Sequence, residues 1–410
     1  MPGDVPLVVR TVRIPDPGPL LALLPAEAPV CWLHRGDGMV AWGVAAEVRP
    51  AGADRFAAAQ RWWHDFVRRS VVRDEVSLPG TGLVCFGSFA YADQPGESVL
   101  VVPRVVVGRR DGTCWLTVVA AGALSPAPTL RSATPPEPPT GTVFSDGAMS
   151  GAAWESVVAT AVGRIRAGRL EKVVLARDLV AELAAPLDVR APLTRLADRY
   201  PACWTFHIDG LFGATPEMLV RRELGLVTSR VLAGTIRRTG DDAHDLTLAA
   251  TLARSSKDLE EHEFAVRSVA QALAVHCHSM NVPDAPFVLH LPNVMHLATD
   301  VTGVLTGDAT SLELAADLHP SAAVGGTPTS AAVALIAEIE GMGRGRYAGP
   351  VGWMNASGDG EWGLALRSAE YDGARVRLFA GCGIVADSDP AAELAEAAAK
   401  FVPVRDALAP

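Results

Sequence analysis

The spacing of apolar residues divides the chain into a strand-rich first part and a mixed remainder. In residues 1–125, short apolar or alternating runs bounded by Gly and Pro, such as LVCFGSFAY and SVLVVPRVVVG, predict strands. Residues 54–69 repeat their apolar positions at helical spacing and predict a helix with Asp54 as its N-cap. Residues 125–143 contain six prolines and predict a stiff, exposed linker.

After this linker, groups of strands alternate with helices. Helical spacing recurs in four segments, at residues 154–169, about 243–278, 328–340 and 390–408. Strand patterns fill the intervals, for example EKVVLARDLVAEL, LVTSRVLAGTIRR and ARVRLFAGCGIVA. Because several strands follow one another between helices, the order favours an α+β fold with antiparallel sheets and helices packed outside them.

The composition narrows the class of protein. The 410 residues carry a formal charge of −10, which argues against a nucleic-acid or anionic-membrane surface because either needs a basic face. The six cysteines are scattered without a CxxC pair, as expected for reduced cytosolic thiols. Neither a signal peptide nor a convincing membrane span is visible, so we expect a cytoplasmic protein. The HCH triplet at 276–278 lies in a predicted helix, where side chains two positions apart diverge, and it does not predict a zinc site.

Lys172 opens an apolar strand whose side chains alternate between two faces. Lys172, Val174 and Ala176 share one face in EKVVLAR. A lysine at this position is usually solvated. If Lys172 points inward instead, burial would lower its pKa and make it a usable base near neutrality.

Two predicted helices carry carboxylates at informative spacing. Glu261 lies on the apolar stripe of its helix, with Ala265 four residues later, whereas Glu263 faces Arg267 and predicts a surface pair. In the last helix, the spacing of Glu393, Glu396 and Lys400 on one face favours a solvated, salt-bridged surface. If inward carboxylates from the two helices met, they would instead form a Mg²⁺ site.

Two glycine-rich segments, SAAVGGTPTS and FAGCGIVA, predict turns. Exposed backbone amides in such turns and at helix N-termini bind carboxylates, and Arg367 of LALRSAEY could add a bidentate partner. Ordinary tight turns explain the glycines equally well. The GMGRGR segment at 341–346 follows a predicted helix and is interpreted as a helix end and turn.

Taken in order, these segments resemble the chorismate-utilising enzyme family. The matching motifs span about residues 150–402 and are EKVVLAR, GATPEMLV, LAGTIRR, KDLEEHEFAV, HLATDVTG, HPSAAVGGTP, YAGPVGW, GDGEWGLALRSA and AGCGIVADSDPAAELAEAAAKF. The resemblance implies an anthranilate synthase component I-like fold, with two stacked antiparallel sheets wrapped by helices and the site between them. It further implies that residues 1–145 form a variable N-terminal part and residues 146–410 the chorismate-binding catalytic region.

Within the family, the motifs are most similar to those of isochorismate synthases, which implies isomerisation of chorismate with Mg²⁺ as cofactor. By motif, Lys172 matches the general base that activates water for attack at ring carbon 2. Glu217 matches the acid that protonates the departing 4-hydroxyl. Glu261 and Glu396 match the Mg²⁺ ligands, and Glu393 a secondary position at the metal. The implied substrate contacts are Gly234, Thr235, His296, Ala323, Arg367, Gly381 and Lys400.

Other activities remain open at this point. A salicylate synthase would share the first step and then eliminate pyruvate, but we expect a threonine at position 323 in that case. Anthranilate and aminodeoxychorismate synthases use an amine nucleophile and need no lysine base, and the latter's PIKGT motif is replaced here by LAGT. A catalytically dead binding protein would not require the intact set of Lys172, Glu217 and the acidic ligands. We therefore expect an enzyme without a glutamine amidotransferase subunit, and the resemblance to the family implies a monomer.

Overall fold

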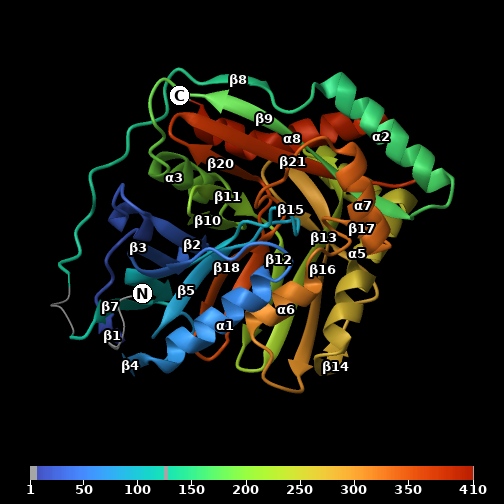
Figure 1. Ribbon diagram of the computed structural model, residues 1–410. Helices are drawn as coiled ribbons and strands as arrows, with labels where there is room; N and C mark the ends of the chain where they lie inside the picture. The colour runs from blue at the N-terminus through green and yellow to red at the C-terminus, as the bar shows by residue number, and fades with distance from the viewer. Residues whose placement is uncertain (1–6, 124–127, 410) are drawn as a thin grey trace.

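The computed structural model describes residues 7–123 and 128–409, and Figure 1 shows them as strands with helices around the outside. The strands are β1 Leu7–Ile14, β2 Val30–His34, β3 Asp37–Val48, β4 Ser70–Asp74, β5 Val84–Ser88, β6 Val99–Arg110, β7 Thr113–Ala121, β8 Val143–Asp146, β9 Lys172–Glu182, β10 Trp204–Ile208, β11 Leu211–Thr215, β12 Met218–Glu223, β13 Leu226–Arg237, β14 Cys277–Asn281, β15 Phe287–His290, β16 Val294–Leu305, β17 Gly326–Thr327, β18 Pro350–Asn355, β19 Gly360–Leu364, β20 Ser368–Asp372 and β21 Arg375–Ile384. The helices are α1 Arg55–Arg68, α2 Gly151–Arg166, α3 Arg190–Arg199, α4 Asp242–Leu252, α5 Ser256–Ala274, α6 Ser311–Leu318, α7 Thr329–Ile339 and α8 Pro390–Leu408, with a short 3-10 helix at Leu20–Leu23.

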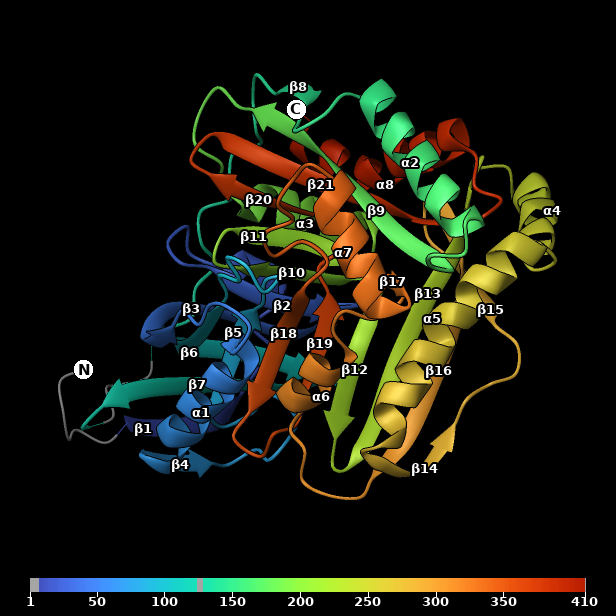
Figure 2. The ribbon, with the colours of Figure 1, turned by 45° about the vertical axis from the view of Figure 1, so that its right-hand side comes forward.

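The strands form one hydrogen-bonded network with two limbs that diverge from β6. The first limb runs β3–β2–β10–β11–β20–β21–β9, and the second runs β5–β18–β19–β12–β13–β16. In the described residues, every pairing is antiparallel except that of β1 with β4. Figure 2 shows the strands of the first limb running across those of the second. The predicted α+β class, with antiparallel sheets wrapped by helices, is confirmed.

The residues before position 146 complete both limbs. Strands β2 and β3 extend the first limb beside β10, and β5 joins the second limb beside β18. Strand β8 pairs with β9 across the proposed boundary at 145–146, and the division into two parts stays a prediction. The proline-rich stretch forms no helix or strand between residues 128 and 142, while its residues 125–127 fall outside the described part.

Helix α5 illustrates how the helices are fixed on the sheet. Its residues Ala265, Val269 and Leu273 are buried at intervals of four and pack against β13 and β16. The single helix expected at 243–278 is wrong in detail, because the chain forms two helices separated at residues 253–255. The Ser255 side chain accepts a hydrogen bond from the Asp258 amide and so starts α5 anew.

The predicted helix is also wrong at its end, because the HCH triplet leaves it. Cys277 begins β14, and the His276 ring pairs with Asp317 at 2.7 Å. The predicted helices at 54–69, 154–169, 328–340 and 390–408 are confirmed as α1, α2, α7 and α8. None of the helices in the described residues is long and apolar enough to cross a membrane.

Candidate active site

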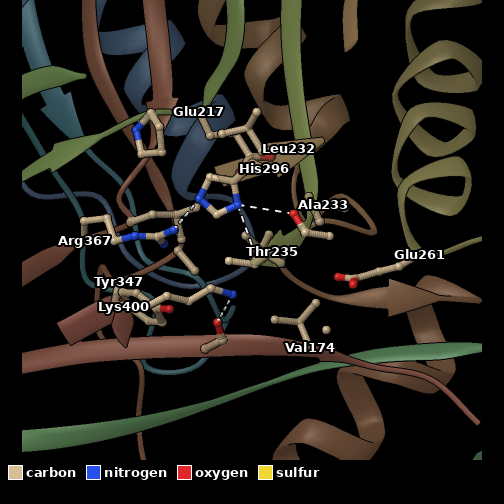
Figure 3. A pocket seen from close by; sticks show the side chains of 18 of the residues that line it. Val174, Glu217, Leu232, Ala233, Thr235, Glu261, His296, Tyr347, Arg367 and Lys400 are labelled. Atoms are coloured by element: carbon tan, nitrogen blue, oxygen red, sulfur yellow. Dashed lines mark hydrogen bonds between the residues drawn. The ribbon is translucent and has the colours of Figure 1, made fainter. Parts of the chain in front are cut away.

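A cavity lies between the two limbs, and most of the predicted site residues line it. It is bordered by β9 and β21 from one limb and by β13 and β16 from the other, with contributions from α5 and α8 (Figure 3). The predicted residues on its wall are Glu217, Gly234, Thr235, Glu261, His296, Ala323, Arg367, Gly381 and Lys400. Lys172, Glu393 and Glu396 are not among the lining residues and are described below.

Glu217 is a buried carboxyl group at the turn between β11 and β12. Glu217 is only 4% exposed, and burial raises the pKa of its carboxyl group to about 8. A backbone hydrogen bond from Leu232 and the charges of Lys172, Arg367 and Lys400 lower this pKa only in part. Glu217 is therefore protonated near neutral pH and can donate a proton inside the cavity.

His296 of β16 connects the two limbs through Arg367. The Arg367 guanidinium donates to His296 Nε2 at 2.9 Å, so the proton of the neutral ring is on Nδ1. That nitrogen lies 3.1 Å from Thr235 Oγ1 and 3.4 Å from the Gly234 carbonyl (Figure 3). Burial, followed by the Arg367 charge, holds the pKa of His296 well below its usual range. A neutral imidazole thus orients the Arg367 cation at the cavity wall.

Unusual backbone conformations at Gly234 and Arg367 position the groups that contact His296. Gly234 forms a bulge in β13, with φ of +77°, and an added Cβ would lie 3.0 Å from the Asp258 Cβ. Arg367, between β19 and β20, has φ of +50°, a left-handed conformation that costs about 1–2 kcal/mol for a non-glycine residue. Both irregularities occur where the strands border the cavity, and they direct polar groups into it.

Lys172 has no exposed surface, and its ammonium faces α5. The Lys172 Nζ lies 3.3 Å from Glu261 Oε1 and 3.4 Å from the Glu261 carbonyl oxygen. Val174 shares its strand face and lines the cavity, as the alternation of EKVVLAR predicts. The structure thus brings Lys172 and Glu261 together at one end of the cavity.

Lys400 of α8 reaches the cavity beside β21. Its Nζ lies 2.6 Å from Glu396 Oε1 and donates to the Gly381 carbonyl at 2.9 Å. Burial alone would lower the pKa of Lys400, but the Glu396 carboxylate raises it further than burial lowers it. The same pair holds the pKa of Glu396 below its usual value, against the effect of burial. Lys400 is therefore a fixed positive charge at the cavity wall.

The expectation of a solvated face on the last helix is wrong. Glu393 is only 2% exposed, and its Oε1 accepts a hydrogen bond from Lys257 Nζ at 2.6 Å. Burial and the neighbouring Glu396 carboxylate raise the pKa of Glu393 above its usual value. The spacing placed these groups on one face correctly, but α8 turns that face toward β21 and not toward solvent.

The carboxylates fit a hard divalent cation. Ligand atoms of Glu393, Glu396 and Cys382 lie within 4.8 Å of one another, and Glu261 lies outside this group. Burial raises the pKa of the Cys382 thiol well above its usual range, so the sulfur stays protonated and is a poor ligand for Mg²⁺. The oxygen donors that remain are those Mg²⁺ prefers, and a divalent cation would relieve the repulsion between Glu393 and Glu396.

Glycines in β21 bring the backbone against these groups. A Cβ on Gly383 would lie 2.0 Å from Glu261 Oε1, and one on Gly381 would lie 3.0 Å from the Leu175 carbonyl oxygen. The FAGCGIVA segment was expected to be a turn, but its glycines lie within the strand. A side chain at position 383 would displace the Glu261 carboxylate, and one at position 381 would crowd the backbone of the neighbouring strand β9.

Sequence comparison relates the chain to a known family. Residues 26–409 match the family model described as chorismate binding enzyme. The chain belongs to this family. It is 34% identical over 400 residues to the salicylate biosynthesis isochorismate synthase of Pseudomonas aeruginosa, covering 92% of this chain and 84% of the relative. It is 37% identical to isochorismate synthase MenF of Bacillus subtilis over 62% of this chain, but the match spans only 55% of that relative.

Solved structures extend the match to the whole fold of this chorismate-binding enzyme. The menaquinone-specific isochorismate synthase MenF of Escherichia coli superposes with a TM-score of 0.81 at 27% identity, covering 100% of this chain and 97% of the other. Anthranilate synthase component I of Streptococcus pneumoniae superposes with a TM-score of 0.70 at 21% identity, covering 90% and 91%. The predicted anthranilate synthase component I-like fold is confirmed.

Sequence reasoning missed two polar residues of this chorismate-binding enzyme that line the cavity. Tyr347 of the YAGPVGW motif stacks on Phe379 with ring centroids 5.0 Å apart, and burial raises its pKa to about 12. Arg344 is buried, pairs with Glu340 at 2.6 Å and donates to the carbonyls of Val174 and Val324. The spacing of four between Glu340 and Arg344 was the available signal, although Arg344 lies in the segment interpreted as a helix end and turn.

Proposed function

We propose that this enzyme isomerises chorismate to isochorismate with Mg²⁺ as cofactor. The observation that carries the proposal is Glu217, a buried carboxyl group with a pKa raised to about 8, in a cavity that also holds the cations Arg367 and Lys400. An acid that keeps its proton at neutral pH is what the loss of a hydroxyl group requires. The isochorismate synthase relatives described above support the same activity.

The reaction moves a hydroxyl group from ring carbon 4 to ring carbon 2. Lys172, in its neutral form, takes a proton from water as the oxygen bonds to carbon 2, and the two conjugated ring double bonds each move by one position. The bond between carbon 4 and its hydroxyl breaks, and Glu217 supplies the proton with which that oxygen leaves as water. Water goes in and water comes out, so the product is an isomer of the substrate. Because the nucleophile is water, no ammonia-supplying glutamine amidotransferase subunit is needed.

The substrate is a dicarboxylate, and the cavity offers matching cations. Arg367 presents a guanidinium held by His296, and Lys400 presents an ammonium held by Glu396. Planar guanidinium groups bind carboxylates in a bidentate manner. Glu261, Glu393 and Glu396 are proposed to hold Mg²⁺, which when bound would attach a substrate carboxylate and withdraw negative charge from the ring.

Product analysis tests this proposal directly. Purified enzyme with chorismate and Mg²⁺ is expected to produce a reversible mixture of chorismate and isochorismate, resolved by chromatography. Ala323 lines the cavity and offers no side-chain hydrogen bond that would hold the ring for pyruvate elimination, so little salicylate is expected. Near-stoichiometric salicylate and pyruvate would show a salicylate synthase instead, and no consumption of chorismate would remove the proposal altogether.

A further inference from the structure

The chain contains few lysines, and all of them pair with carboxylates of the proposed Mg²⁺ site. Of its 36 basic residues, three are lysines (Lys172, Lys257 and Lys400) and the other 33 are arginines (36 − 3). Each lysine pairs with a different one of the three carboxylates proposed to hold Mg²⁺. Lys172 pairs with Glu261 at 3.3 Å, Lys257 with Glu393 at 2.6 Å and Lys400 with Glu396 at 2.6 Å.

The proposed reaction uses two of these lysines and leaves the third without a role. Lys257 lies in the first turn of α5, and its side chain is 32% exposed while that of Glu393 is 2% exposed. The carboxylates of Glu393, Glu396 and Glu261 all attract its ammonium group. Lys257 therefore reaches from the solvent side to the buried carboxylate of Glu393.

Lysine and arginine differ in how firmly they hold a carboxylate. Arginine presents a planar fork that binds both carboxylate oxygens, whereas lysine presents a compact charge on a flexible stem. In a chain that otherwise relies on arginine, a lysine at this position indicates a pair that can separate. The partial exposure of Lys257 gives its ammonium group a route to water when another cation takes its place.

We propose that Lys257 is a tethered cation that neutralises Glu393 in the metal-free protein and is displaced when Mg²⁺ binds. This inference rests on the proposed Mg²⁺ site. It explains how the Glu393 carboxylate stays buried beside Glu396 before the metal arrives, because leaving a charge buried without a partner is strongly destabilising. It also means that Mg²⁺ affinity is set partly by competition with a side chain of the protein.

The competition is tested by metal binding without substrate. Mn²⁺ binding is measured from the signal of the free ion in electron paramagnetic resonance, with Mg²⁺ added as competitor, for wild type and Lys257→Met. Methionine keeps the apolar stem and removes the charge, so Mn²⁺ should bind about tenfold more tightly, as expected from the loss of one charge-assisted hydrogen bond. Lys257→Arg should weaken binding by a similar factor, because its fork holds Glu393 more firmly.

A matched control separates this effect from a general change in net charge. Arg267→Met lies on the same helix and removes one positive charge from an exposed pair with Glu263, so its Mn²⁺ affinity should equal that of wild type. Thermal unfolding gives a second measurement. Lys257→Met should melt lower than wild type without metal, and saturating Mg²⁺ should raise its melting temperature by more than it raises that of wild type.

Unchanged or weaker Mn²⁺ binding by Lys257→Met would overturn the proposal and make Lys257 a support that holds Glu393 in position. If Lys257→Met fails to fold, Lys257→Gln, which keeps a hydrogen-bond donor without the charge, is measured in its place. Failure of the metal site itself is distinguishable, because wild type and Arg267→Met would then also bind no Mn²⁺.

Discussion

The carboxyl groups at two ends of the site have pKa values shifted in opposite directions. At one end, Glu217 accepts a backbone hydrogen bond from Leu232, and its pKa is raised to about 8. At the other end, Glu396 contacts Lys400 at 2.6 Å, and its pKa is held below the usual value despite burial. For Glu217 the effect of burial outweighs that of the nearby cations, whereas for Glu396 the direct contact with Lys400 outweighs burial.

The largest expected effect comes from removing the proposed base, Lys172. Lys172→Ala should lower kcat by about 10²–10⁴-fold, the usual contribution of a general base, while chorismate binding measured by calorimetry remains. Folding is checked by circular dichroism, because Lys172 is fully buried and its loss leaves Glu261 without a partner. A variant that keeps most of its kcat would show that another group activates the water.

Glu217→Gln tests the proposed acid, because glutamine has nearly the same shape as glutamate. The amide cannot deliver a proton, so kcat should again fall by about 10²–10⁴-fold. In wild type, kcat should decline as pH rises through about 8, because only the protonated carboxyl group is active. A profile that is flat from pH 6 to pH 9 would contradict the assignment.

The same substitution should change stability in the direction set by linkage. The unfolded carboxyl group ionises near pH 4.5, while the folded one keeps its proton until about pH 8, so wild type loses stability as pH rises between these values. Glu217→Gln should therefore match wild type at pH 4 and exceed it by up to about 4 kcal/mol at pH 8. Urea unfolding at the two pH values measures the difference.

The ligand end is tested by Glu396→Ala. With this substitution the Mg²⁺ concentration needed for half-maximal activity should rise by about tenfold or more, because two carboxylates remain in place of three. Lys400 would also lose its partner, so the KM for chorismate is measured alongside. In wild type, a chelator should abolish turnover and added Mg²⁺ should restore it; full activity of metal-stripped enzyme would exclude the metal.

A smaller effect is expected at Ala323, which belongs to neither end. Ala323→Thr adds a hydroxyl group to the cavity wall that can hold the ring for pyruvate elimination, so the salicylate fraction should rise. One such group is worth about 1–3 kcal/mol, which predicts a partial shift between products. Salicylate fluorescence during chorismate consumption follows it, and an unchanged fraction would remove Ala323 as the determinant.

The smallest effect belongs to an ion pair outside the cavity. On α5, Arg267 Nη2 lies 3.4 Å from Glu263 Oε1, and the side chains of Glu263 and Arg267 are 73% and 51% exposed. Glu263→Ala should change the free energy of unfolding by less than about 0.5 kcal/mol and leave kcat unchanged. A large loss of activity would mean that the surface of α5 influences the site.

The sequence alone predicted the fold class, the family and most of the cavity wall. Helical spacing placed Glu261 on the buried stripe of α5 and Glu263 on its surface, and strand alternation placed Lys172 and Val174 on one face. These predictions succeed because side-chain direction follows directly from the local period of the backbone. Residues outside helices and strands, such as Glu217 and Ala323, have no periodic pattern and were identified only through the family motifs.

Only the tertiary structure decided which of these faces meet. The same local spacing describes Glu263 on a solvated surface and Glu393 in the core, because helical period says nothing about what the helix packs against. The raised pKa of Glu217 depends on its burial between strands distant in sequence, and the pairing of Lys257 with Glu393 joins positions 136 residues apart. Burial and ion pairing are properties of contacts between distant segments, and these contacts exist only after the two limbs close around the cavity.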